Sequence, residues 1–409
     1  MNKTMQPDIA SERGAVLVHV AIALVGLMAF SAVVIDYGVM WVARRQAQNA
    51  ADAAALAGAI SLAYVDFNNQ ALARQSALTV ASQNEVWGEA PDVTAADVTF
   101  PACPPGSPGA GTNSCVRVDV FRNQRAGGSP LPTFFGKLVG IEEQGVRATA
   151  TAEALFGNST DCVKPFAIPD KWLEARGDVA PAGWSENDSF ERYIQNGANR
   201  GQVYTPTADS YPPGSGYSPK SVSVGGGDHG RYITLKNGGP HDSITPGWFH
   251  PVVINPSEGP GGANYRGNIA TCDLTVIGPG TVLDVEPGNM IGPTKQGMQD
   301  LIALDRFADW DPNLYGPGKG GVTGGCMGDG TCVVSPRLVA IPVYDPDAYN
   351  LAAASGRTTI NIVKVLGFFI DKMQGNDVAG WITNYPAEAN AAMGGVPGNN
   401  FVVSVALVR

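Results

Sequence analysis

The feature that most constrains this chain is an uncharged apolar stretch near its N-terminus. Residues Ala15 to Ile35 include no Asp, Glu, Lys or Arg, and only His19, Gly26 and Ser31 interrupt the apolar side chains. A helix that crosses the roughly 30 Å hydrocarbon core of a bilayer needs about 20 such residues. A cleaved secretory signal has a shorter apolar region, of about 7–15 residues, with a small-residue cleavage site just beyond it. We therefore expect residues 15–35 to be an uncleaved transmembrane helix, preceded by a short N-terminus at residues 1–14.

Two polar side chains mark the ends of this anchor. His19 lies about one turn inside the first boundary, where it is either a functional group within the membrane or a side chain that reaches the headgroup layer. Asp36 follows the span directly. It either caps or pairs with the backbone or a charge of a partner, or it is an ordinary carboxylate at the interface.

The helix is expected to continue beyond the membrane. Residues 36–66 are rich in alanine, the best helix former, and contain no proline. One helix from about residue 15 to 65 would be about 75 Å long at 1.5 Å per residue. Its small side chains suit close packing, either on the chain's own folded domain, which we favour, or in a bundle with other chains.

All six cysteines lie C-terminal to the span. An even number confined to one side of a membrane indicates disulfides in an oxidising compartment, although six buried free thiols are the alternative. Cys103–Cys115 and Cys326–Cys332 are close in sequence and flank glycine-rich loops, which leaves Cys162–Cys272 as the third pair.

The orientation signals conflict. Arg44 and Arg45 follow the span, and positive charges near a span favour the cytoplasmic side. Long domains, however, are translocated largely regardless of charge. We weigh the cysteines more heavily and expect the large C-terminal region to lie outside the cytoplasm.

The N-terminal segment resembles a known family. The residues that carry the likeness are Glu12-Arg13-Gly14, the apolar run, Asp36-Tyr37-Gly38, and the stretch from Ala43-Arg44-Arg45-Gln46 to Ala55-Leu56-Ala57-Gly58-Ala59. Together they resemble the N-terminal module of TadE/TadG-like Flp (Tad) pilus-assembly proteins. The segments Asp161 to Asp170 and Gly288 to Gly297 also look like TadG-related proteins.

This resemblance implies a single-pass protein of the bacterial inner membrane. Its N-terminus would be cytoplasmic and its large C-terminal region periplasmic, with a role in assembling a Tad/Flp pilus used in adhesion. Its partners would be inner-membrane lipid and other Tad/Flp assembly proteins. Prepilin-like members carry Glu five residues after the cleavage-site glycine, but His19 stands at that distance from Gly14, which argues against processing by a prepilin peptidase. No Asp is followed two residues later by Ser, so a von Willebrand factor A domain with its metal site is not supported.

The rest of the chain predicts an α+β protein with two further domains. Residues 67–157 predict a small α+β domain, with helices at 69–84 and 132–139 and strands at 98–100, 116–121 and 145–155. Residues 158–409 are rich in glycine, proline and turns and predict a mainly β domain. Its strands are expected at 232–235, 252–254, 281–285, 337–343, 360–370, 379–383 and 401–408, with one helix at 294–308.

Few residues suggest chemistry. His229, His241 and His250, near Asp228 and Asp242, are a candidate metal or hydrolase site, but nothing in their spacing requires one, and we expect solvated loop histidines. Asp309, Asp311 and Asn313 place oxygen ligands at alternate positions as weak calcium candidates, which turn formation explains equally well.

These observations predict a protein that works through its surfaces. The formal net charge of −10 argues against nucleic-acid binding. We expect no catalytic residues and no cofactor. The alternatives are an anchored periplasmic module that binds a ligand or calcium and, less favoured, an anchored hydrolase.

Overall fold

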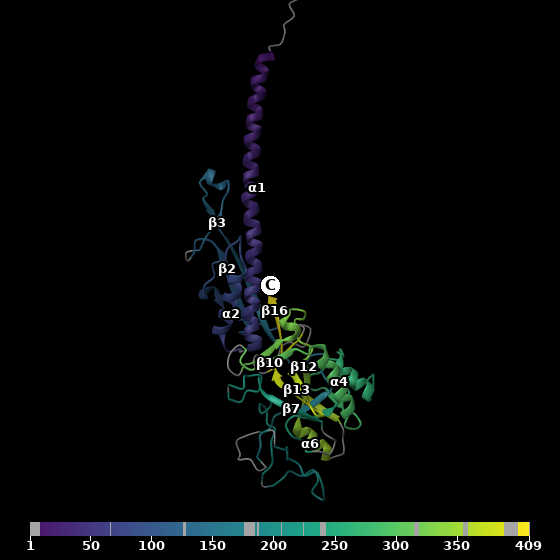
Figure 1. Cartoon of the computed structure of the whole chain (residues 1–409). Coiled ribbons are helices and arrows are strands. Elements are labelled where there is room, and N and C mark those ends of the chain that lie inside the picture. Colours follow the sequence, from purple (N-terminus) through teal and green to yellow (C-terminus); the bar gives the residue numbers. More distant parts are fainter. Residues whose placement is uncertain are drawn as a thin grey trace, which may run out of the picture.

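One long helix leads from the N-terminal end of the chain into its folded region (Figure 1). Helix α1 (Ile9–Ile60) has 52 residues and is about 78 Å long at 1.5 Å per residue. It contains no proline and ends in a π-helical turn, Ser61–Val65. This confirms the continuous helix expected from the sequence. The computed structural model describes residues 9–65, 67–125, 128–175, 185, 188–205, 207–223, 225–237, 243–314, 319–354, 359–387 and 400–408.

Short helices and many strands follow, which confirms the predicted α+β class. The helices are α2 (Gln70–Gln83), α3 (Gly262–Ala270), α4 (Ile291–Leu304), α5 (Gly325–Gly328) and α6 (Pro346–Ala354), with 3₁₀ turns at Ala95–Asp97 (η2) and Gly136–Val139 (η4). The strands are β1 (Val98–Thr99), β2 (Cys115–Arg122), β3 (Leu131–Pro132), β4 (Glu143–Gln144), β5 (Val146–Gly157), β6 (Phe166–Pro169), β7 (Tyr232–Asn237), β8 (Trp248–Pro251), β9 (Val282–Asp284), β10 (Ala308–Asp311), β11 (Gly321–Gly324), β12 (Leu338–Tyr344), β13 (Thr359–Gln374), β14 (Asp377–Thr383), β15 (Tyr385–Pro386) and β16 (Val402–Val408).

A five-stranded sheet lies beside the C-terminal half of α1. Its strand order is β1-β2-β5-β16-β15. Strand β16, from the end of the chain, pairs antiparallel with β5, so Val405 lies opposite Ala154. The sheet therefore combines strands from residues 98–157 with strands from residues 385–408, and β15 and β16 connect it to the second part of the fold.

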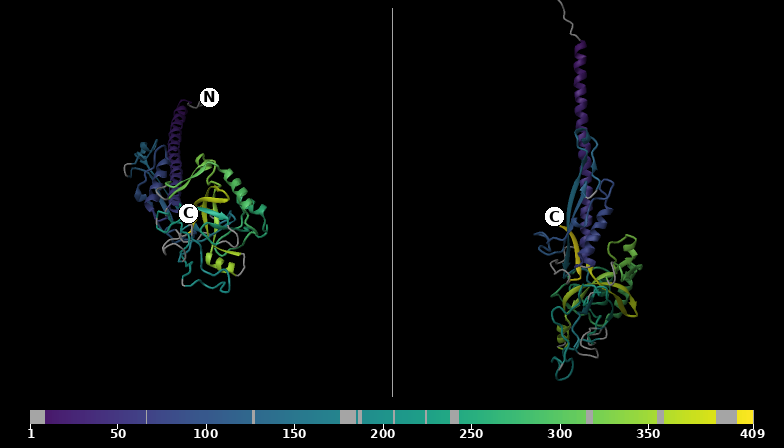
Figure 2. Two further views of the ribbon diagram at one scale, coloured as in Figure 1. Left: turned by 60° about the horizontal axis from the view of Figure 1, so that its bottom comes forward. Right: turned by 90° about the vertical axis from the view of Figure 1, so that its left-hand side faces the viewer.

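The second part is built around a ring of six strands. Their order is β12-β6-β8-β7-β14-β13, and β13 pairs again with β12, which closes the ring. Apolar residues from all six strands form one cluster, and residues of α3 and α4 join it. The alternate faces of several of these strands contribute to a second cluster. Figure 2 shows this part at the end of the molecule opposite the N-terminus.

Two local expectations were wrong, and a third was confirmed with shifted bounds. The helix expected at 132–139 is only the short turn η4, preceded by β3. The strand expected at 252–254 lies at 248–251, where an apolar and aromatic run is fully buried. The helix expected at 294–308 is α4, which begins and ends earlier, and α3, α5 and α6 were not anticipated. Helix α3 (GANYRGNIA) contains two glycines, which are weak helix formers.

Candidate functional site

Helix α1 has two halves with opposite environments. From Val16 to Ile35 the described side chains are exposed. Among the described residues, α1 is the one helix long and apolar enough to cross a membrane. The apolar segment of α1 that could lie in a lipid bilayer is therefore not covered by other described parts of the protein.

The other half of α1 is packed against the protein. A stripe of alanines on one side of the helix is fully buried: Ala43, Ala47, Ala50, Ala51, Ala54, Ala55 and Ala59. It packs on alanines of α2 and on apolar side chains of β2 and β5. Small side chains let the helix and the sheet approach closely. Of the two roles considered for the alanine-rich segment, the structure shows packing on the chain's own domain.

Asp36 connects the two halves of α1 to a distant loop. Its carboxylate accepts hydrogen bonds from the backbone N–H groups of Phe134 at 2.8 Å, Phe135 at 3.1 Å and Gly136 at 2.6 Å. The Gln144 side chain also donates to the Asp36 carbonyl at 3.4 Å. These backbone donors, that of Phe134 first, lower the pKa of the Asp36 carboxyl. Asp36 therefore acts as a cap, and the backbone that it caps belongs to its own chain.

Aromatic and basic residues follow Asp36 along α1. Tyr37 and Trp41 are exposed, and the Arg45 guanidinium lies 5.2 Å from the centre of the Trp41 ring. Tyr and Trp are enriched where a protein passes from lipid to water. This stretch has the composition of a membrane interface, directly after the apolar run.

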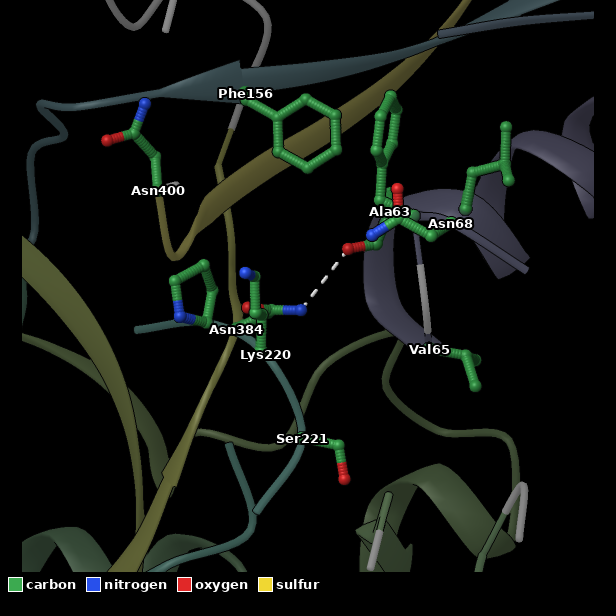
Figure 3. A pocket seen from close by; sticks show the side chains of 11 residues that line it. Ala63, Val65, Asn68, Phe156, Lys220, Ser221, Asn384 and Asn400 are labelled. Atoms are coloured by element: carbon green, nitrogen blue, oxygen red, sulfur yellow. Dashed lines mark hydrogen bonds between the residues drawn. The ribbon is translucent and has the colours of Figure 1, made fainter. Parts of the chain in front are cut away.

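The far end of α1 meets the strand ring at a small pocket (Figure 3). Asn384, just after β14, donates through its side-chain amide to the carbonyls of Ala63 at 3.2 Å and Tyr64 at 3.4 Å. The pocket has a volume of about 160 Å³. Sites for drug-sized ligands are usually about 300–1,000 Å³. We interpret the contact as a junction that fixes the helix end to the ring.

The histidines do not behave as the sequence suggested. His250 lies in β8 and His229 precedes β7, and both are buried rather than solvated. His250 packs among Trp248, Tyr344 and Tyr349, with ring centres 4.3–5.6 Å away. Burial lowers the pKa of His250 to about 3 and lowers that of His229. The expectation of solvated loop histidines was therefore wrong for these two. His241 and Asp242 lie outside the described residues.

The acidic candidates occupy ordinary structural positions. Asp228 is fully buried and pairs with Lys171 at 2.9 Å and with Arg231 at 2.8 Å. Asp309 and Asp311 lie in β10, where their carboxylates accept hydrogen bonds from the backbone of the next residue and of Asn313 respectively. Neither belongs to a group of three His, Cys, Asp or Glu ligand atoms within the described part of the chain.

The structure brings the six cysteines together as three pairs at disulfide distance. The Cα atoms lie 5.2 Å apart in Cys103–Cys115 and in Cys326–Cys332. They lie 4.5 Å apart in Cys162–Cys272. These are the pairs expected from the sequence.

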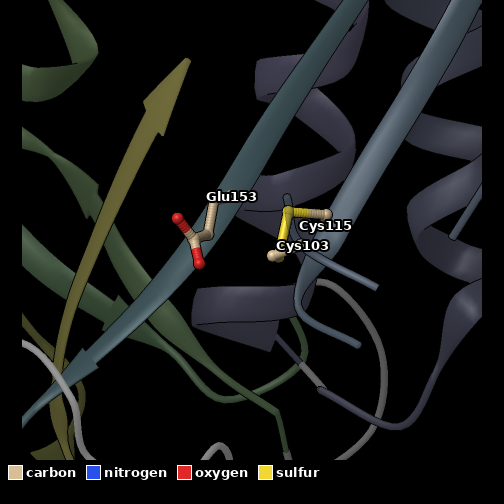
Figure 4. Close-up of side chains that lie close together, drawn as sticks. All are labelled: Cys103, Cys115 and Glu153. Carbon is tan, nitrogen blue, oxygen red and sulfur yellow. A yellow bond between two sulfur atoms is a disulfide. The ribbon is translucent and has the colours of Figure 1, made fainter. Parts of the chain in front are cut away.

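Two of these pairs have a carboxylate nearby, and these are the two groups of potential metal ligands among the described residues. Glu153 lies beside Cys103 and Cys115 (Figure 4), and Asp305 beside Cys326 and Cys332. Burial raises the pKa of Glu153. Because metals bind thiolates and these sulfur atoms are paired with each other, we interpret both groups as structural.

The two further segments that we compared with TadG-related proteins, residues 161–170 and 288–297, contribute to the packing of α3 and α4. In the first, Lys164 is buried and donates to the Asn268 carbonyl at 3.3 Å and to the Thr271 carbonyl, at the C-terminal end of α3, where a positive charge is favourable. In the second, Gly297 lies where a Cβ atom would be 2.8 Å from Cβ of Ile269, so it lets α3 and α4 meet closely.

Comparison with protein families identifies the N-terminal module. Residues 14–61 match the family of Flp pilus-assembly TadE/G-like proteins. Comparisons with curated proteins and with solved structures give no match. The chain therefore carries a TadE/G-like module, as its sequence suggested. The matched residues run from the apolar span through Asp36 to the alanine stripe, and the family is one of pilus assembly rather than of enzymes.

Proposed function

We propose that this chain is a single-pass bacterial inner-membrane protein that takes part in assembling a Tad/Flp pilus used in adhesion. The observation that carries the proposal is that the family match at residues 14–61 coincides with α1, whose first half is apolar and exposed. Residues 15–35 would cross the bilayer, residues 1–14 would be cytoplasmic, and the region from residue 36 onward would be periplasmic.

The proposed role depends on surfaces, with no catalytic residue and no cofactor. Support comes from the buried positions of the candidate residues, because His229, His250 and Asp228 are engaged in packing or ion pairs within the folded region. The partners would be membrane lipid and other Tad/Flp assembly proteins. Neither the hydrolase alternative nor the calcium alternative gains support from the described residues.

The periplasmic orientation is supported by the cysteine pairs. All three lie on the C-terminal side of the span. Disulfides persist in the periplasm and are rare in the cytosol. Arg44 and Arg45 alone would favour the opposite orientation. The proposal therefore depends on the translocation of a long, folded C-terminal region.

Complementation tests the need for the anchor. In the bacterium that encodes the chain, we would delete its gene and restore it either intact or with residues 1–35 replaced by a cleavable secretory signal. The intact chain is expected to restore surface pili, counted by electron microscopy and measured in sheared fractions. The released form is expected to fail although it accumulates with its cysteines oxidised. Normal pili in the deletion strain would contradict a role in assembly, and full rescue by the released form would contradict the need for an anchor.

A further inference from the structure

The loop held by Asp36 reaches the level at which the apolar span ends. This loop, residues 131–144, is called the tip loop here. In Figure 1 and in the right-hand view of Figure 2, the segment carrying β3 extends further along α1 toward its N-terminus than any other part of the folded region. Its distance from α1 is fixed by the hydrogen bonds from residues 134–136 to the Asp36 carboxylate.

The tip loop carries apolar side chains that point away from the core. Phe134 is 55 % exposed, Phe135 36 % and Ile141 54 %. The base of the same loop is anchored by Leu131, which is fully buried. Exposed apolar groups concentrated at one tip, on a loop with an anchored base, indicate a contact surface rather than scattered surface residues.

Several backbone groups of the tip loop have hydrogen-bond partners within the protein. Besides the donors bound by Asp36, the Ile141 N–H donates to the Gly136 carbonyl at 2.9 Å. The Thr133 hydroxyl donates to the carbonyls of Ile141 at 2.7 Å and Glu142 at 2.9 Å. A non-helical segment that enters a region poor in water needs such internal partners, because each unsatisfied group is costly there.

We infer that the tip loop is a second membrane contact, which inserts Phe134, Phe135 and Ile141 into the outer headgroup layer beside α1. This inference rests on the proposed anchoring of residues 15–35. The occupant is lipid rather than protein because Asp36, which holds the tip loop, directly follows the apolar span, so the exposed side chains of the loop lie at the level where the span ends. Exposed Lys137, Glu142 and Glu143 limit the depth to the interface, where a lysine side chain can extend toward the headgroups.

With this membrane contact, Asp36 and the tip loop would together orient the folded region on the membrane. A single helix leaves the folded domain free to tilt and rotate, whereas a second contact fixes its orientation on the membrane. The surfaces that meet the pilus machinery would then face a defined direction. Asp36 is the positioning residue, since it holds the tip loop against the helix.

Photo-crosslinking tests the contact in the full-length chain. The photoreactive phenylalanine analogue p-benzoylphenylalanine would be placed, one position at a time, at Phe134 and Phe135, in protein reconstituted into nanodiscs of phosphatidylethanolamine and phosphatidylglycerol. Two other phenylalanines serve as matched controls. Phe30 lies within the span and is 69 % exposed, whereas Phe307, between α4 and β10, is 84 % exposed and belongs to the part of the fold distant from the span.

The expected result is lipid adducts, identified by mass spectrometry, at positions 30, 134 and 135 and none above background at 307. Labelling at 30 without labelling at 134 or 135 would overturn the tip contact and leave the anchor intact. Absence of labelling at 30 would overturn the anchoring itself. Protein adducts from 134 and 135 in place of lipid adducts would show that this surface binds a second copy of the chain, which would also overturn the inference.

A second variant pair tests the role of Asp36. Asp36→Ala is expected to lower the lipid adduct yield at position 134 relative to that at position 30, because the loop loses its acceptor. Asp52→Ala removes a carboxylate from the same helix, where Asp52 accepts from Gln48 at 2.8 Å, and is expected to leave the yield unchanged. Equal yields in both variants would contradict the positioning role.

Discussion

The close approach of α1 to the sheet predicts an unusual response to a glycine substitution. Gly58 lies on the buried side of α1, and a Cβ atom there would be 2.8 Å from Cγ1 of Val116 in β2 and 3.4 Å from the Ala73 carbonyl oxygen in α2. Favourable carbon–carbon contacts are about 3.5–4.0 Å. Val116 cannot easily turn aside, because a β-branched side chain has few rotamers. Gly58→Ala therefore overpacks this contact, which typically costs about 1–3 kcal/mol.

A second glycine on the same helix, Gly38, serves as a control that separates the steric cost at Gly58 from the gain in helix propensity. Replacing a helical glycine by alanine is worth about 1 kcal/mol of intrinsic helix stability, and this gain applies at both sites. No atom lies within 4 Å of the position that a Cβ atom would take at Gly38. Gly38→Ala should therefore stabilise the protein, whereas Gly58→Ala should be about 1–3 kcal/mol less stable than Gly38→Ala.

Thermal unfolding in detergent micelles, followed by circular dichroism, measures the difference. One kcal/mol corresponds to roughly 2–4 °C in Tm for domains of 150–250 residues. We expect Gly58→Ala to melt several degrees below Gly38→Ala. Equal stabilisation by the two variants would contradict this prediction and would show that α1 does not approach β2 as closely as the structure indicates.

Two further predictions concern stability. Because the pKa of His250 is depressed to about 3, the unfolded state binds an additional proton below pH 6.5, and stability falls as the pH is lowered. Between pH 7 and pH 5 this group lowers the free energy of unfolding by about 2 kcal/mol. In denaturant titrations at several pH values, the free energy of unfolding of His250→Phe should therefore fall less with decreasing pH than that of the wild type. An equal fall in both proteins would contradict the prediction. The disulfide Cys162–Cys272 closes a chain separation of 110 residues and Cys326–Cys332 one of 6. From loop-closure entropy, the first disulfide stabilises the protein by about 4.8 kcal/mol and the second by about 2.4 kcal/mol. The variant with both cysteines of the first pair replaced by alanine should therefore be about 2 kcal/mol less stable than the same variant of the second pair, and the reverse order would contradict this prediction.

Helix α1 and parts of strands β2 and β5 could be predicted from local sequence patterns. An uncharged apolar run followed by an alanine-rich run predicts one long helix, and alternation in residues 116–121 and 145–155 predicts strands that the structure contains as parts of β2 and β5. Each of these signals lies within a few neighbouring residues, where helix propensity and side-chain periodicity act.

The features that were missed depend on contacts between distant residues. The donors to Asp36 lie 98–100 residues away, so no local pattern shows that this carboxylate holds a loop. The parallel pairing of β6 with β12, in which Ile168 lies opposite Val343, and the pairing of β16 with β5 are likewise non-local. The burial of His250 had a local signal in Trp248 and Phe249, since an aromatic run is typical of a buried strand.

The orientation of the chain in the membrane can be measured with reporter fusions. A reporter active only in the periplasm and a reporter active only in the cytoplasm would be fused after Arg409 in two separate fusion proteins, with thiols titrated before and after reduction. If the large region is periplasmic, the periplasmic reporter is active, the cytoplasmic reporter is inactive, and six thiols appear only on reduction. Activity of the cytoplasmic reporter with six free thiols would contradict the proposed orientation, the disulfides and, with them, the anchored periplasmic role in pilus assembly.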